Sequence, residues 1–180
     1  VWFDDVKGGI LERLLRLSRH APPDVQLGFH FCYGDVQHRH FKEPTDAGTL
    51  VDVANALAAS LGRPLNWIHL PVPRERLDEA YYAPLRELRL HSETELYLGL
   101  IHLTDGVEGT IRRMELARRF VSGFGVATEC GWGRRPPATI PELLRIHAAV
   151  SAPIQHARGP RQRFQWPSGF QRVPDQDWTL

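Results

Sequence analysis

The sequence lacks the features that mark several large classes of protein. It has only two cysteines, Cys32 and Cys130, far apart along the chain, which excludes the disulfide-dense framework of small secreted domains. No apolar run is long enough to span a bilayer, and the chain does not begin with a signal-peptide pattern. We therefore expect reduced thiols, a cytoplasmic location and no membrane partner.

An excess of charge of one sign is also absent. The 22 Lys and Arg residues nearly balance the 21 Asp and Glu residues, and the arginines are scattered along the chain. This gives no reason to expect a nucleic-acid partner. What remains is an ordinary globular composition, 42% hydrophobic over 180 residues, which is enough for one domain with a core. Because the chain begins at Val1 rather than Met, we expect it to be part of a longer protein.

Stretches with helical spacing of apolar residues alternate with short apolar runs. Helices are predicted over about 6–19, 46–61, 74–88, 107–121 and 139–149, the third with an interruption near Pro84. Strands are predicted over 25–32, 65–70, 95–103 and 124–130. Residues 151–180 mix prolines with polar and isolated aromatic residues, and are predicted to be an irregular or disordered tail behind a catalytic domain of residues 1–150.

One helix followed by four strand–helix units predicts an α/β fold with parallel strands and right-handed crossovers. Two architectures fit this order: an open doubly wound sheet, or the second half of a (β/α)8 TIM-type barrel. We predict the half-barrel. Since half a barrel leaves strand edges unpaired, the other half is expected from a preceding segment, a partner chain or self-association.

Each predicted strand ends in reactive side chains, which are His30 and Cys32, then His69, then His102 with Asp105 just beyond, and finally Glu129 and Cys130. Parallel strands share one carboxyl edge, where active sites of such folds lie. Residues i and i+2 of a strand point to the same face, so His30 and Cys32 can converge on one point, and both are good zinc ligands. A single Cys or His in a strand is usually structural, but four strands bringing such residues to one rim indicate a site.

The ligand types indicate what such a site does. Two thiolates with one or two further ligands and an open position are typical of catalytic zinc, and the wide cysteine spacing does not fit a zinc knuckle. Thiolate-rich zinc favours the activation of another thiol.

Other polar residues near the rim have weaker claims. Tyr33, Asp35 and Arg134 are candidate substrate contacts on rim loops. We expect His38 and His40, in the polar loop 34–44, to be solvated or substrate-facing rather than ligands. The remaining histidines are expected at the surface, namely His20, His91, His147 and His156.

The stretch His30-Phe31-Cys32-Tyr33, the strand ends at His69 and Leu100-Ile101-His102, and the run Glu129 to Arg134 resemble a known family. It is the C-terminal catalytic domain of cobalamin-independent methionine synthase, within the methionine synthase–uroporphyrinogen decarboxylase-like barrel superfamily, matched over roughly residues 5–150. The resemblance implies a (β/α)8 barrel whose zinc is held by a His-x-Cys pair, a Glu and a late Cys.

Residue by residue, His30, Cys32 and Cys130 match that ligand pattern. His69 stands about where the family has its Glu, so His69 or solvent is expected as the fourth ligand. His102 resembles the family's catalytic histidine. Family members transfer a methyl group from methyltetrahydrofolate to homocysteine in methionine biosynthesis, which implies a small-molecule thiol and a methyl donor as partners.

The hypothesis is therefore a methyltransferase in which zinc on His30, Cys32 and Cys130 holds a thiol as thiolate. His102, oriented by Asp105, would donate a proton to the leaving group. The loop 34–44 is longer than in the family, so the substrate of this chain could be a different thiol or a different methyl donor. Two alternatives remain: a barrel fragment without activity of its own that needs a partner half, and a metal-dependent lyase, decarboxylase or demethylase on the same barrel.

Overall fold

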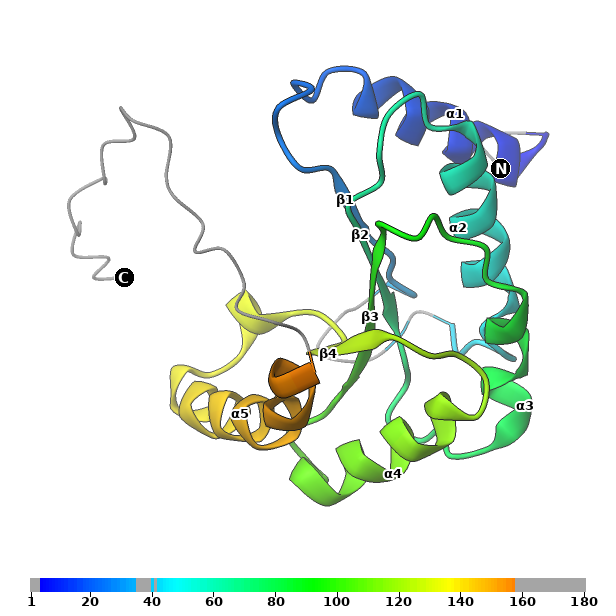
Figure 1. Cartoon of the computed structure of the whole chain (residues 1–180). Helices are drawn as coiled ribbons and strands as arrows, with labels where there is room; N and C mark the ends of the chain where they lie inside the picture. Colours follow the sequence, from blue (N-terminus) through cyan, green and yellow to red (C-terminus); the bar gives the residue numbers. More distant parts are fainter. Residues whose placement is uncertain (1–3, 35–39, 41, 158–180) are drawn as a thin grey trace, which may run out of the picture.

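The structure is a computed structural model that describes residues 4–34, 40 and 42–157, with side chains to residue 151 (Figure 1). Its helices and strands are, in order, α1 (Val6–Ser18), β1 (Gly28–His30), α2 (Gly48–Ser60), β2 (Trp67–Pro71), α3 (Glu79–Tyr82), β3 (Glu95–Ile101), α4 (Gly106–Arg118), β4 (Phe124–Thr128) and α5 (Ile140–Ala157). Short 3₁₀ turns follow α3 and β4, namely η1 (Ala83–Glu87), η2 (Trp132–Arg134) and η3 (Pro137–Thr139). The alternation confirms the predicted α/β fold.

The four strands form one all-parallel sheet in the order β1-β2-β3-β4. A doubly wound sheet needs a point where the strand order reverses, and these four strands have none, so their order supports the partial barrel. Crossovers of one hand then place the connecting helices on a single face. Figure 1 shows α1 to α5 following one another in an arc around the strands, and α1 contacts α2 while α4 contacts both α3 and α5.

The core lies between the sheet and this layer of helices. Alternate residues of β2 and β3, such as Ile68, Leu70 and Leu98, are almost fully buried against it. Helix α2 contributes its own buried stripe at helical spacing, consisting of Leu50, Val51, Ala54, Leu57 and Ala58. The helices therefore cover one face of the sheet, as in a barrel wall.

The opposite face of the sheet is only partly covered. Trp67 and Tyr97 are half-buried there, and their rings lie over glycines of the neighbouring strands: a Cβ on Gly28 would meet the Trp67 indole at 1.9 Å, and one on Gly125 the Tyr97 ring at 2.6 Å. In a closed barrel this face lines the interior.

Three elements differ in extent from the sequence prediction. β1 is confined to Gly28–His30 because residues before it bond elsewhere: the Leu27 N–H donates to the Asn66 side chain, and the Val25 carbonyl accepts from Arg63. The third helical stretch is only α3 followed by η1, with a proline in the first turn of η1, as the predicted interruption near Pro84 implied.

The last helix was predicted to end near Ala149, but α5 runs to Ala157. Its buried stripe continues through Ile146 and Val150, so the single missing N–H of Pro153 does not end it. The remainder of the predicted tail lies outside the described residues. Within the part of the chain that the structure describes, no helix is both long and apolar enough to cross a bilayer.

Candidate metal centre

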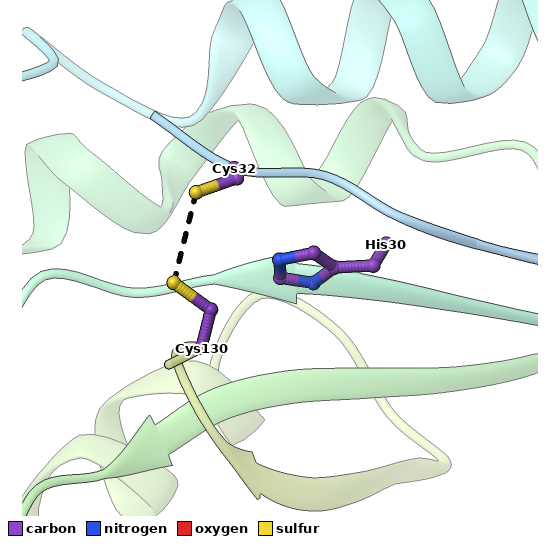
Figure 2. A group of neighbouring side chains, drawn as sticks. All are labelled: His30, Cys32 and Cys130. Carbon is purple, nitrogen blue, oxygen red and sulfur yellow. Dashed lines mark hydrogen bonds between the residues drawn. The ribbon is translucent and has the colours of Figure 1, made fainter. Parts of the chain in front are cut away.

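The carboxyl ends of the two outer strands bring three potential ligands together. His30 is the last residue of β1, Cys32 follows two residues later, and Cys130 follows the end of β4 by two. One ligand atom from each of these residues lies within 4.8 Å of the other two. The two sulfur atoms face each other at 3.7 Å, with the His30 ring beside them (Figure 2). The sequence predicted that side chains from different strand ends would meet at the carboxyl edge of the sheet, and these three residues do so.

The separation of the sulfur atoms suits a tetrahedral metal. Two thiolates at about 2.3 Å from zinc, at the tetrahedral angle, lie about 3.8 Å apart. The set of two sulfurs and one imidazole nitrogen is soft, and selects zinc or a similar metal over magnesium or calcium. These residues therefore fit a soft metal ion, with a fourth position left for another ligand.

His69 lies behind His30 rather than beside the sulfurs. The Nδ1 atoms of the two rings are 2.8 Å apart, in hydrogen-bond contact, and the rings stack with centroids at 4.8 Å. Burial, and then the neighbouring His30, lower the pKa of His69 to about 4, so His69 is neutral at pH 7 and its Nδ1 can accept from His30. The hydrogen bond occupies Nδ1 of His30 and leaves Nε2 for a metal, as is usual for ligating histidines.

This arrangement corrects the predicted role of His69 as fourth ligand. His69 is absent from the converging group, because its Nδ1 is directed at His30. Figure 2 shows a ring nitrogen of His30 on the side of the ring nearer the sulfurs. His69 orients the ligand, and the fourth position is left to solvent or substrate.

The backbone after Cys32 supports its sulfur. The Gly34 N–H donates to Cys32 Sγ at 3.3 Å, which holds the sulfur in place. Gly34 has a φ of 81°, a left-handed conformation that a residue with a Cβ adopts only at a cost. The turn therefore requires glycine at this position.

His102 is buried close to the same edge. Its Nε2–H donates to the Val72 carbonyl at 2.9 Å, and its Nδ1 lies 3.8 Å from a Glu129 carboxylate oxygen. Burial, aided by the cation of Arg113, lowers the pKa of His102 to about 4. His102 is thus neutral at pH 7, with Nδ1 free to accept a proton.

Asp105 does not orient His102. Its carboxylate accepts two hydrogen bonds from the Arg113 guanidinium, at 2.6 and 2.8 Å, and Arg113 is completely buried. Burial alone would raise the pKa of Asp105, but the Arg113 contacts outweigh burial and lower it. The hydrogen bond to Val72 orients the His102 ring instead, so the predicted orienting role of Asp105 is wrong, while a catalytic role for His102 stays a prediction.

The sequence prediction gave no role to Glu129, and it expected His40 to be solvated or to face substrate. His40 Nε2 contacts the Glu129 carboxylate at 2.8 Å, and His40 Nδ1 contacts Glu43 at 3.2 Å. Burial opposes the charged form of His40, but these two carboxylates outweigh it and raise the pKa of His40. Glu129 thus lies between a protonatable His40 and a neutral His102. The signals for Glu129 in the sequence were its place at a strand end, next to Cys130, and in the run Glu129 to Arg134.

The three predicted substrate contacts have different outcomes. The Tyr33 hydroxyl contacts the Tyr81 hydroxyl at 2.9 Å, and Tyr81 donates to the Pro71 carbonyl, so Tyr33 anchors its loop. Arg134 is exposed. Asp35, like His38 and Arg39 of the same loop, lies outside the described residues.

A cavity of about 680 Å³ adjoins Cys130, and its lining includes His40, His102, Glu129 and Arg135. The sequence prediction chose Arg134, but its neighbour Arg135 reaches this cavity. A smaller cavity on the other side of Cys130 is lined by Trp132 and His147, whose rings meet edge to face at 5.6 Å. His147 is therefore half-buried near the centre, and the prediction that it lies on the surface is wrong.

Fold and site together define a parallel α/β protein of partial-barrel type with a candidate soft-metal centre at the carboxyl edge of its strands. A scan against protein-family models found no match, and searches of curated proteins and of solved structures found none either. The function therefore has to be inferred from the site itself.

Proposed function

We propose that this chain is the metal-binding half of a zinc-dependent methyltransferase that transfers a methyl group to a thiol. The observation that carries the proposal is the convergence of His30, Cys32 and Cys130, with sulfurs 3.7 Å apart. The resemblance to cobalamin-independent methionine synthase adds homocysteine as the acceptor and methyltetrahydrofolate as the donor.

The chain's own residues prepare this chemistry. Zinc bound at the cluster would lower the pKa of a substrate thiol and hold it as a nucleophilic thiolate. His69 holds the His30 ring in position, and Gly34 stabilises the Cys32 sulfur through its N–H. These contacts fix two of the three ligands before any substrate arrives.

In this proposal, three residues that line the larger cavity transfer the proton, namely His40, Glu129 and His102. His102 Nδ1 accepts a proton, and Glu129 separates it from His40, whose pKa is raised. A proton held on His40 is thus one carboxylate away from His102, which passes it to the leaving group of the methyl donor.

We further propose that the sheet face bearing Trp67 and Tyr97 is covered by another barrel half or by a second copy of the chain. Both rings are half-buried on the face opposite the described helices, and among the described residues the outer strands β1 and β4 each have a single partner in the sheet. The same observations support the alternative of a barrel fragment that is inactive without its partner.

Metal binding tests the core of the proposal. We expect the purified 180-residue chain to bind one zinc ion, and the cobalt-substituted protein to absorb in the region of sulfur-to-cobalt charge transfer. Cys32→Ser combined with Cys130→Ser should lose both signals, while the exposed His20→Ala variant keeps them. Unchanged zinc binding in the double variant would refute the site.

Activity tests the finer claim. In the native protein, or with its partner half supplied, methyl transfer from methyltetrahydrofolate to homocysteine should depend on zinc. A zinc-loaded protein that removes carboxyl or methyl groups without a thiol acceptor would instead be the lyase, decarboxylase or demethylase alternative.

A further inference from the structure

Among the described residues that line the larger cavity, one arginine has no ion pair. Arg74, Arg76 and Arg135 all line it. Arg74 pairs with Glu75, and Arg76 pairs with Asp78. Within the part of the chain that the structure describes, the buried Nε of Arg135 has no hydrogen-bond partner. Among the described residues, Arg135 is thus the arginine of this cavity without a counter-charge.

The acidic residues of the cavity are already engaged. Glu129 contacts His40, Glu43 contacts the other nitrogen of the same ring, and Glu75 is held by Arg74. A guanidinium that lacks a counter-charge gains from a ligand anion that pairs with it. The charge pattern therefore favours an anion at Arg135.

We propose that Arg135 binds a carboxylate or phosphate group of the small molecule whose reacting end lies at the metal centre. This inference rests on the proposed function, because it takes Cys130, which lines the same cavity, as a metal ligand. The planar guanidinium matches the geometry of both oxyanions. A volume of about 680 Å³ lies in the usual range for small-molecule sites. The substrate class is thus a thiol, or a methyl donor, that carries an oxyanion.

The probe pair for this proposal is 3-mercaptopropionate and 3-mercaptopropan-1-ol, which differ only in the anion. Their affinities are measured by calorimetry on the metal-free and the zinc-loaded 180-residue chain. We expect the acid to bind about tenfold more tightly than the alcohol. Propionate and inorganic phosphate, titrated separately, should shift the Arg135 Nε–H resonance, and the more tightly bound of the two identifies the oxyanion.

Variants of two neighbouring residues provide the matched control. Arg135→Gln should abolish the preference for the acid, Arg135→Lys should retain part of it, and Arg134→Gln should leave it intact. Equal binding of acid and alcohol, an unchanged preference in Arg135→Gln, or loss of the preference in Arg134→Gln would overturn the proposal. Zinc binding is measured on the same samples. Absence of the anion preference in the wild-type chain, with zinc binding intact, refutes only this inference, whereas failure of the wild-type chain to bind zinc refutes the proposed function.

Discussion

His69 supports the candidate metal centre from behind the three converging residues. Its Nδ1 is in hydrogen-bond contact with Nδ1 of His30, which leaves Nε2 of His30 on the side of the sulfurs. His69→Ala should weaken zinc binding about 10–100-fold, whereas His30→Ala should remove a ligand and weaken it further. Competition with a chelator of known affinity measures both, and His20→Ala is the control. Equal losses in His69→Ala and His30→Ala would mean that His69 is itself a ligand.

The ion pair of Asp105 and Arg113 contributes to the stability of the fold. Asp105→Asn leaves a fully buried guanidinium without its counter-charge and should cost about 3 kcal/mol of unfolding free energy. Denaturant titration measures it. Glu142→Gln, which breaks a similar but exposed pair with Arg145, should cause no measurable change.

The pH dependence of that pair has a definite sign. The pKa of Asp105 is lower in the folded chain than its ordinary value of 3.8, so its contribution is complete above pH 3.8 and is lost as the pH falls through the folded pKa. The difference in stability between the wild type and Asp105→Asn should therefore be constant near neutrality and shrink below about pH 4. A difference that stays constant to pH 2 would exclude the pair as its origin.

Sequence reasoning at this scale predicted which side chains converge, but not the neighbours that hold them. His30, Cys32 and Cys130 were predictable because parallel strands share one carboxyl edge. The roles of His69 and Asp105 depend on which ring nitrogen or oxygen faces which neighbour. The choice between Arg134 and Arg135 depends on the turn η2 that precedes Arg135, and no spacing rule gives that direction.

Among the structural elements, the turn after β1 is the one that requires a particular residue, because Gly34 has a left-handed backbone. Gly34→Ala should strain the left-handed backbone by about 1–2 kcal/mol and displace the N–H that supports Cys32 Sγ. We expect lower stability and weaker zinc binding, measured by denaturation and chelator competition. Gly62→Ala, where a Cβ meets open space, is the control. Undiminished zinc affinity in Gly34→Ala would show that the N–H···S contact is unimportant.

The helices and strands themselves were largely predictable, because each buried stripe follows the helical or strand period. The predictions that were wrong concern the ends of elements whose extent depends on contacts with distant residues. Asn66 and Arg63 bond to the residues before β1 and shorten it. In α5, the buried stripe carries the helix past Ala149.

For the whole molecule, the partly covered sheet face predicts association. The 180-residue chain should sediment as a dimer or larger species at micromolar concentration, because Trp67 and Tyr97 lie half-buried on the face opposite the described helices. Trp67→Lys should shift it towards monomer, while Leu144→Lys on the exposed side of α5 should not. A wild-type chain that is folded and monomeric would contradict this prediction.

The 3.7 Å separation of the Cys32 and Cys130 sulfurs has a consequence of another kind. Bond formation requires them to approach to about 2.05 Å, and Cys32 is exposed while Cys130 is partly exposed. One equivalent of hydrogen peroxide would take two electrons and two protons from the thiols, forming one S–S bond and two water molecules. Such oxidation removes two of three ligands at once, so an oxidising environment would switch off the centre and a reductant would restore it.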